Sequence, residues 1–129
     1  MPYEPKRSPL DPCPVEAVLV IISGKWKVRI LYQLSLEACS FADLMRGMGG
    51  IKQQVLTTQL RALEKDGVVN RAVHSEKDSK LRYSIYSLTK EGLDLIGILR
   101  TMALWGEDRL RIQGLNWQAP TQIRSKRMK

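Results

Sequence analysis

The sequence predicts a mainly helical domain that carries one β-hairpin. Apolar residues recur at helical spacing in five separate segments, and two short segments rich in Val, Ile and Tyr lie between the fourth and fifth of these. At 129 residues, with 43% hydrophobic and 26% charged residues, the chain suits one compact core and is too apolar to be disordered. We therefore expect a single folded domain.

Composition at the two ends sets the predicted boundaries. Residues 1–12 contain four of the six prolines and little apolar patterning, so we expect a flexible arm before a domain at 13–112. Residues 113–129 are predicted to form a loose basic tail. The net charge is +8, but the last six residues hold four cations and no acid, which leaves 17 cations against 13 acids and a net charge of +4 elsewhere. Such an excess favours a polyanionic partner.

Two helices are expected after the arm. Pro14 suits a first helical turn, and the nearly continuous apolar run from Val15 to Ile22 predicts a short helix that is buried on most sides. Ser23 and Gly24 end it. The next helix is expected from Lys25, with an apolar stripe made of Trp26, Ile30, Leu31 and Leu34.

A third and a fourth helix are separated by glycines. Ser40 and Asp43 have the spacing of a capping box, which precedes a short apolar face formed by Phe41, Leu44, Met45 and Met48. Gly49 and Gly50 then predict a turn. The fourth helix is expected from Lys52 to Asp66, before Gly67, and its buried side is formed by Leu56, Leu60 and Leu63.

The hairpin precedes a long final helix. Val68–His74 and Leu81–Leu88 favour strands, and the polar run at 75–80 predicts their connection. Thr89 can cap a helix that extends to about Arg111, whose apolar residues cover more than one face. Because one face is enough to reach the chain's own core, the surplus favours burial of this helix against a second subunit. The residues assigned to that interface are Val15, Leu19, Leu95, Leu99, Met102 and Trp105.

This order of elements is that of a winged helix-turn-helix, in which the fourth helix reads DNA and the hairpin is the wing. The predicted DNA-binding residues of the recognition helix are Lys52, Gln53, Gln54, Thr57, Thr58 and Arg61, with no acid before Glu64. Glutamine amides can pair with adenine and threonines with several bases, while Lys52 and Arg61 suit phosphates. In the wing, the candidates are Arg71, His74, Lys77, Lys80 and Arg82.

Several motifs in this order resemble the HxlR-type regulators, a winged-helix group near the MarR proteins. They are Cys13-Pro14-Val15-Glu16, Gly24-Lys25-Trp26, Phe41-Ala42-Asp43-Leu44, Gly50-Ile51, Leu56-Thr57, the run from Leu60 to Gly67, Tyr86-Ser87-Leu88-Thr89, Gly92 and Trp105-Gly106. The resemblance implies a homodimer built from the first and last helices, with recognition helices in successive major grooves. It also implies, for some members, a sensor of oxidants or electrophiles at the place of Cys13. Lys52-Gln53 replaces the Ser-Pro pair that commonly opens the family's recognition helix.

The two cysteines have alternative interpretations. A helix N-terminus favours the thiolate of Cys13, although Glu16 opposes it, so Cys13 is either a sensor thiol or a structural residue. Cys39 is interpreted as structural. Two cysteines cannot build a disulfide framework in a chain of this size, which favours a reducing compartment and hence the cytoplasm, on the nucleoid when DNA is bound. His74 is the single histidine, so no metal site or cofactor is predicted.

These patterns favour a sequence-specific transcriptional regulator that binds double-stranded DNA as a homodimer on a near-palindromic operator. The sequence contains no recognisable catalytic nucleophile with a general base, no phosphate-binding loop and no dinucleotide-binding fingerprint. An enzyme is therefore not predicted. No apolar run approaches the roughly 18 residues that cross a membrane. The alternative is a non-specific nucleic-acid-binding or protein-interaction module with the same fold. Both the regulator and the alternative module are compatible with a small-molecule or oxidant effector, whose identity the sequence leaves open.

Overall fold

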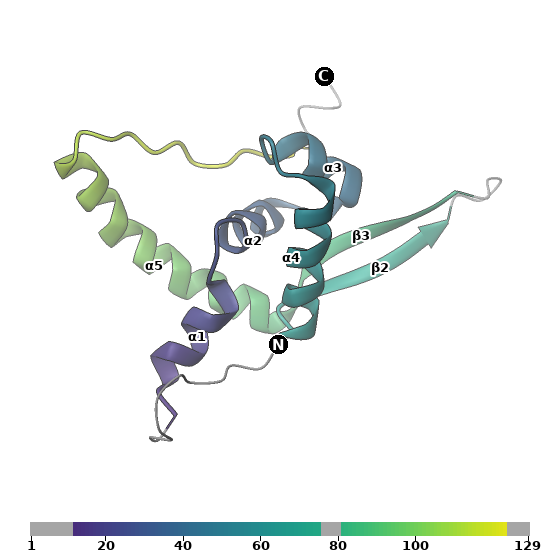
Figure 1. Ribbon diagram of the computed structural model, residues 1–129, viewed down its shortest axis with the longest axis horizontal. Coiled ribbons are helices and arrows are strands. Elements are labelled where there is room, and N and C mark those ends of the chain that lie inside the picture. The colour runs from purple at the N-terminus through teal and green to yellow at the C-terminus, as the bar shows by residue number, and fades with distance from the viewer. Residues whose placement is uncertain (1–11, 76–80, 124–129) are drawn as a thin grey trace.

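The computed structural model describes residues 12–75 and 81–123. Figure 1 shows α2, α3 and α4 grouped together, with the β2–β3 hairpin extending to one side and the long α5 to the other, beside α1. The elements in chain order are α1 (Pro14–Ile22), α2 (Lys27–Leu36), β1 (Cys39–Ser40), α3 (Phe41–Gly47), α4 (Gln53–Lys65), β2 (Val69–Ser75), β3 (Arg82–Leu88) and α5 (Lys90–Ile112). The fold is therefore mainly helical with a β wing, as predicted.

The wing is one strand larger than the expected hairpin. The sheet is antiparallel with the order β1-β3-β2, and β1 adds to the edge of β3 through the pairs Cys39 with Tyr86 and Ser40 with Ile85. Two residues are too few to show the alternation that identifies a strand in sequence, which is why β1 was not predicted. Through β1, the base of the wing is joined directly to the start of α3.

Local capping signals formed as expected at two helices. The Asp43 backbone N–H donates to the Ser40 hydroxyl and the Ser40 N–H donates to the Asp43 carboxylate, each at 3.0 Å, so the capping box of α3 is confirmed. Thr89 accepts from the Gly92 N–H at 3.1 Å and caps α5. The expected start of α2 at Lys25 was two residues early. Gly24 has a φ of 101°, which turns the chain just before that helix.

The core lies where α2, α3 and α4 meet the beginning of α5. Its most deeply buried side chains are Ile30, Leu31, Cys39, Asp43, Leu44, Leu56, Leu60, Leu63 and Ile96. Tyr32 adds a polar link from α2 to α5, because its hydroxyl donates to the Leu99 carbonyl oxygen at 3.0 Å. Desolvation by burial raises the pKa of Tyr32 above its usual value, which keeps the phenol protonated as this donor.

The burial of two residues corrects their predicted assignment to the dimer interface. Leu95 and Leu99 are 7% and 3% exposed within the single chain, where they belong to its own core. They therefore cannot supply the free apolar surface expected of them. The other four predicted interface residues, Val15, Leu19, Met102 and Trp105, are all exposed in the single chain.

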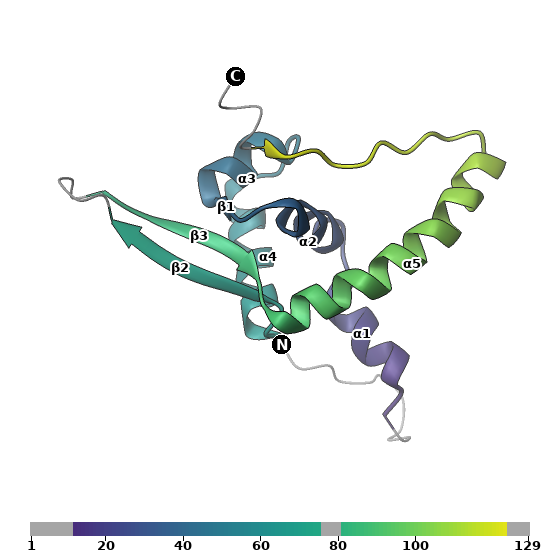
Figure 2. The ribbon, with the colours of Figure 1, turned by 180° about the vertical axis from the view of Figure 1, so that it is seen from behind.

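The chain also folds back after α5. We define the C-terminal strap as residues 115–123, which cross from the end of α5 to α3 (Figures 1 and 2). Ile123 is only 8% exposed, and the buried Gln33 side chain donates to the Thr121 carbonyl oxygen at 2.6 Å. The expectation of a loose tail is thus wrong at the end of the strap, because Ile123 finds an apolar site and Gln33 supplies a hydrogen bond. Residues 1–11 of the predicted arm and 124–129 of the tail lie outside the described residues.

Candidate nucleic-acid interface

Helix α4 separates a buried leucine face from a polar outward face. Leu56, Leu60 and Leu63 are at most 1% exposed and fix the orientation of the helix on the core. Lys52, Gln53, Gln54, Thr58 and Arg61 are exposed, and Thr57 is half-buried. The first acid of the helix is Glu64, so three turns of the outward face carry only neutral or positive side chains. Such a face suits contact with the base edges and the phosphates of a nucleic acid.

The two threonines of α4 use their hydroxyl protons within the helix. Thr57 donates to the Gln53 carbonyl oxygen and Thr58 to the Gln54 carbonyl oxygen, each at 2.9 Å. This i to i−4 bonding is common for threonine in helices. It leaves the methyl groups and the remaining oxygen lone pairs available outward, so these side chains are better suited to apolar contact than to donating a hydrogen bond.

The beginning of α4 presents uncapped backbone. Lys52 is the N-cap residue, with an extended conformation and no capping hydrogen bond from its side chain, and no acid lies in the first turn. Gly49 and Gly50 have φ values of 56° and 93°, which allows the chain to turn tightly into the helix. The backbone N–H groups of a first turn and the positive end of the helix dipole attract phosphate oxygens.

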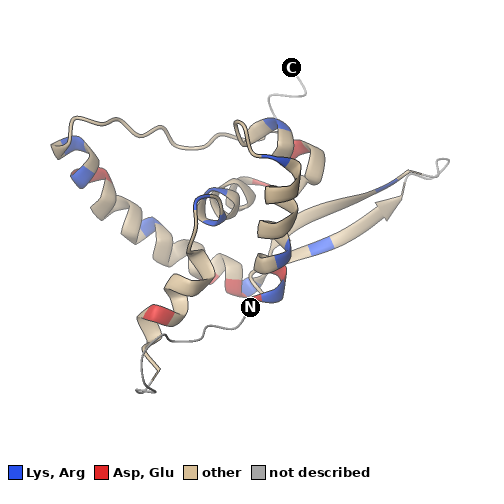
Figure 3. Cartoon of the chain, in the orientation of Figure 1, with Lys and Arg blue, Asp and Glu red and all other residues tan. Residues whose placement is uncertain are grey.

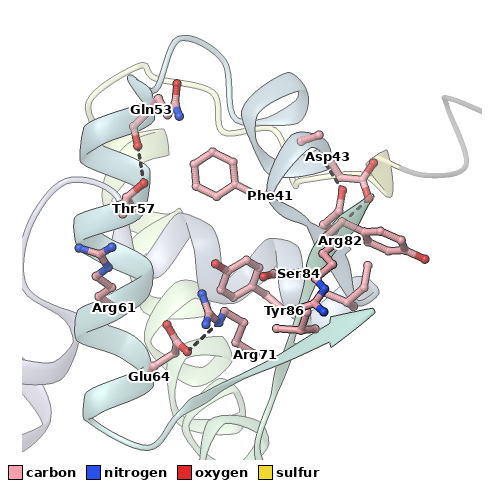
Figure 4. A pocket seen from close by; sticks show the side chains of 15 residues that line it. Phe41, Asp43, Gln53, Thr57, Arg61, Glu64, Arg71, Arg82, Ser84 and Tyr86 are labelled. Atoms are coloured by element: carbon pink, nitrogen blue, oxygen red, sulfur yellow. Dashed lines mark hydrogen bonds and ion pairs between the residues drawn. The ribbon is translucent and has the colours of Figure 1, made fainter. Parts of the chain in front are cut away.

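A groove of about 830 Å³ separates α4 from the wing, and we call it the α4–wing groove. Its walls come from α3, α4, β2 and β3. Figure 4 shows Gln53, Thr57, Arg61 and Glu64 following one another along α4, opposite Arg71, Ser84, Arg82 and Tyr86 from the sheet. Arg71 approaches Glu64 at 3.9 Å, which partly offsets the charge of the groove at that end of the helix. The groove thus brings together Gln53, Thr57 and Arg61 with the wing residues Arg71 and Arg82.

Positive charge lies beside the groove, though not only there. Figure 3 shows Lys and Arg at both ends of α4 and on the wing strands, with acidic residues where α4 ends and further Lys and Arg on α2 and α5. In α3, which forms another wall of the groove, Asp43 is buried and engaged by Ser40 and by Arg46, which lies 2.5 Å away. A buried and paired carboxylate opposes an incoming polyanion much less than an exposed one does.

The wing supplies an aromatic pair, of which sequence reasoning assigned His74 to the site and missed Tyr83. His74 and Tyr83 are opposite each other in the β2–β3 register, and their rings stack with centroids 5.8 Å apart. Both are exposed. The signal was present in the sequence, because a hairpin centred on residues 78 and 79 pairs these two positions. The predicted wing cations Lys77 and Lys80 lie outside the described residues.

An apolar surface runs along α1 and α5, away from the wing. Its exposed members are Val15, Leu19, Leu93, Ile98, Met102, Leu104 and Trp105. Trp105 is 65% exposed even though the Arg109 guanidinium lies over its ring, 4.4 Å from the centroid. Exposed apolar side chains that gather into patches are characteristic of interaction sites. Leu93, Ile98 and Leu104 were not among the predicted interface residues, because helical spacing alone did not separate them from the core positions of α5.

The two cysteines occupy different environments. Cys13 is exposed and is the N-cap residue of α1, without a capping hydrogen bond from its side chain. Cys39 is fully buried in β1, with its sulfur 3.6 Å from the Glu37 carbonyl oxygen. A dissolved oxidant can therefore reach Cys13 and not Cys39 in the folded chain.

Within residues 12–75 and 81–123, no group of three or more His, Cys, Asp or Glu side chains is placed to hold a metal ion. None of the helices there has both the length and the apolar character that spanning a bilayer requires.

Comparisons with known proteins agree with this architecture. A family model described as HxlR-like helix-turn-helix matches residues 21–113. The transcriptional regulator YtcD of Bacillus subtilis, described as an uncharacterized HTH-type protein, is 42% identical over 101 residues, which is 78% of each chain. YdeP from the same organism is 42% identical over 95 residues, covering 74% of this chain and 72% of YdeP.

Solved structures extend the likeness to three dimensions. The redox regulator HypR in its reduced form superposes with a TM-score of 0.71 at 36% identity, covering 79% of this chain and 98% of HypR. A transcriptional regulator assigned to the MarR family from Enterococcus faecalis has a TM-score of 0.68 at 35% identity, over 78% of this chain and 88% of that one. The helix-turn-helix, the wing and these relatives together show that the chain is a winged-helix protein of the HxlR-like helix-turn-helix family of transcriptional regulators.

Proposed function

We propose that this chain is a sequence-specific regulator of transcription that binds duplex DNA as a homodimer. The observation that carries the proposal is the outward face of α4, which carries no acid before Glu64 and borders the groove beside a wing with exposed arginines. Each subunit presents α4 to one half-site of a near-palindromic operator, with half-site centres about 10 base pairs apart. Because its target is DNA, we propose a cytoplasmic location.

The side chains divide into base readers and phosphate contacts. Gln53 and Gln54 occupy the first turn of α4, the part of a recognition helix that reaches base edges, and their amides match the two hydrogen-bonding groups of adenine. Thr57 and Thr58 offer methyl groups to thymine. Lys52, Arg61 and the wing residues Arg71, His74, Lys77, Lys80 and Arg82 are assigned to the DNA backbone or a neighbouring groove.

The homodimer rests on the apolar surface of α1 and α5. Val15, Leu19, Met102 and Trp105 expose between 47% and 65% of their surfaces in the single chain. Covering such side chains in a second copy removes apolar area from water, at about 25 cal/mol for each Å². In such a dimer a two-fold axis relates the two copies of α4, which matches the symmetry of a palindromic site.

We further propose that Cys13 is a sensor thiol. The relatives include a redox regulator known in reduced and oxidised forms, and Cys13 is exposed at the N-terminus of α1, where a dissolved oxidant can reach it. Hydrogen peroxide oxidises the thiol to a sulfenic acid with release of water. The sulfenic acid then condenses with the Cys13 thiol of the second subunit, which forms a disulfide and releases a second water.

Selection of bound duplexes from a random DNA pool at about physiological salt tests the proposal. A near-palindromic motif is the expected result, and recovery of random sequences would contradict sequence-specific recognition. A second arm repeats the selection after peroxide treatment, with the native chain and with Cys13→Ser. Loss of the motif only where Cys13 is present supports the sensor role, whereas equal behaviour of the two proteins contradicts it.

A further inference from the structure

The α4–wing groove has the size and the lining of a pocket for a small organic molecule. Its volume of about 830 Å³ lies within the range of about 300 to 1,000 Å³ that is usual for ligand pockets. Phe41 and Tyr86 contribute aromatic rings to its walls, and Val73 and Ile85 contribute aliphatic side chains. Figure 4 shows the Phe41 ring between the side chains of α4 and those of the sheet. The DNA contacts proposed above use the polar side chains of this groove and leave its aromatic lining without a role.

Positive charge enters the groove from three elements. Arg61 belongs to α4, Arg71 to β2 and Arg82 to β3, and all three are exposed. Among the described residues, no ion pair engages Arg61 or Arg82, whereas Arg71 lies 3.9 Å from Glu64. The second acid of the lining, Asp43, is buried and already hydrogen-bonded. The groove therefore favours an anion over a cation.

A planar aromatic carboxylate matches both features of the groove. The guanidinium group of an arginine can hold a carboxylate through two parallel hydrogen bonds. Aromatic rings pack on one another in offset or edge-to-face geometry, and the half-buried Phe41 ring supplies such a surface. An inorganic anion would use the arginines and leave the aromatic lining in contact with water. A neutral aromatic molecule would use the lining and leave the guanidinium groups without a partner.

Such a molecule would occupy side chains that DNA also needs. Gln53, Thr57 and Arg61 line the groove and are the proposed DNA contacts of α4. Two ligands that need the same side chains cannot be bound there at once, so the molecule and the duplex compete. Release from DNA by this route requires no change in the fold of the subunit.

We propose that the α4–wing groove is a binding site for a planar aromatic carboxylate, held by Arg61 or Arg82 and by the Phe41 ring, which displaces DNA by direct competition. The inference rests on the proposed function. At ten times its Kd, a competing ligand lowers the apparent affinity for the operator about 11-fold. The regulator would thereby respond to the concentration of such a molecule.

Direct binding to the full chain, without DNA, is the first test. Isothermal titration calorimetry compares benzoate and naphthoate with naphthamide, the neutral analogue of naphthoate, and with inorganic phosphate, an anion that has no ring. We expect naphthoate to bind with a Kd below about 1 mM and naphthamide to bind about tenfold more weakly. Phosphate should bind no better than naphthamide.

Three variants and one control locate the site. Arg61→Gln and Arg82→Gln each remove one exposed guanidinium group, and at least one of them should weaken naphthoate binding about tenfold. Phe41→Leu keeps an apolar side chain without the ring and should weaken it about threefold. Arg29→Gln removes an exposed cation of α2 that does not line the groove and should change nothing. Melting midpoints confirm folding, and the exposed arginine variants keep the test valid if Phe41→Leu fails to fold.

Displacement of DNA is the second test. The native chain is bound to the fluorescent duplex recovered by the selection, and naphthoate is added at constant ionic strength, because added salt alone weakens the complex. The anisotropy should fall with a midpoint that follows from the Kd measured by calorimetry. Naphthamide at the same concentration should leave the complex intact.

Four results would overturn the inference. Neither carboxylate binds; the arginine variants and Phe41→Leu bind naphthoate as the native chain does; phosphate binds as well as naphthoate; or the duplex stays bound when naphthoate saturates the chain. The proposed function fails separately, if the native chain selects no preferred duplex. The calorimetry contains no DNA, so its result does not depend on that outcome.

Discussion

The Thr57 hydroxyl donates its hydrogen bond to the Gln53 carbonyl oxygen one turn earlier in α4, at 2.9 Å. The proton that would otherwise identify a base acceptor is therefore already used inside the helix. What Thr57 still presents to the α4–wing groove is its methyl group and one side of its oxygen. This relationship changes what substitution of Thr57 is expected to do.

Thr57→Val should keep the sequence preference of the native chain, whereas Thr57→Ser should weaken it at one thymine. Valine retains a methyl group in place and serine loses it, and contact with the thymine methyl is an apolar interaction. Repeating the selection from a random pool with both variants measures the effect. A preference lost with valine and kept with serine would show that the hydroxyl, not the methyl group, contacts the base.

Gln54→Ala should relax the sequence preference at one position of each half-site, with a loss of about 1 to 3 kcal/mol in discrimination there. The matched control is Arg61→Ala, which should weaken binding to all duplexes by a similar factor because a phosphate contact carries no sequence information. Competition among duplexes with single base changes distinguishes the two. Uniform weakening by Gln54→Ala would remove Gln54 from the base readers.

Affinity of the native dimer should fall steeply with salt. If 6 to 10 phosphates are neutralised, the slope of log affinity against log salt is about −5 to −9. Titration of one duplex between low and physiological salt gives this value directly. A slope near zero would mean that the arginines of the groove and wing do not contact the backbone.

Exposed and buried residues of α5 should respond differently to substitution. Trp105→Gln should shift the chain from dimer to monomer with little change in the fold, because Trp105 is exposed in the single chain. Leu99→Ala should instead cost about 2 to 5 kcal/mol of unfolding free energy, as expected for a truncated core leucine. Sedimentation and denaturant unfolding provide the two readouts. An unchanged dimer in Trp105→Gln would exclude this residue from the interface.

Gly92→Ala should destabilise the domain strongly. A Cβ at Gly92 would collide with the Val68 carbonyl oxygen, which itself accepts the Thr89 N–H at 3.1 Å. Backbone atoms cannot move aside as cheaply as a flexible side chain, so the start of α5 must shift away from β2. Thermal unfolding of Gly92→Ala measures the loss, with Gly106→Ala as the control because nothing lies within 4 Å of a Cβ there. Equal melting temperatures would contradict the close packing.

The sequence predicted those features whose determinants are local. The Ser40 and Asp43 capping box depends on residues three positions apart, and the Thr89 cap is equally local, so both could be recognised before the fold was known. The polar face of α4 followed from the spacing of its leucines. Because that spacing fixes which side of α4 is buried, most residues predicted for the recognition helix are indeed exposed.

Features that depend on distant contacts were missed. β1 exists because Cys39 and Ser40 meet Tyr86 and Ile85, more than 40 positions away in the chain. The docked Ile123 depends on a space above Gly47 that no spacing rule reveals. On α5, apolar residues cover several faces, so periodicity could not assign Leu95 and Leu99 to the chain's own core while leaving Leu93 and Ile98 outside it.

The small strand β1 has a mechanical consequence. It joins the edge of β3 to the capped start of α3, so the wing and the helix-turn-helix are braced against each other. In the proposed homodimer, a change at α1 is therefore expected to alter how the two subunits lie relative to each other and not the angle between the wing and the recognition helix. Control of the proposed regulator would then consist in setting the spacing of the two recognition helices along the duplex.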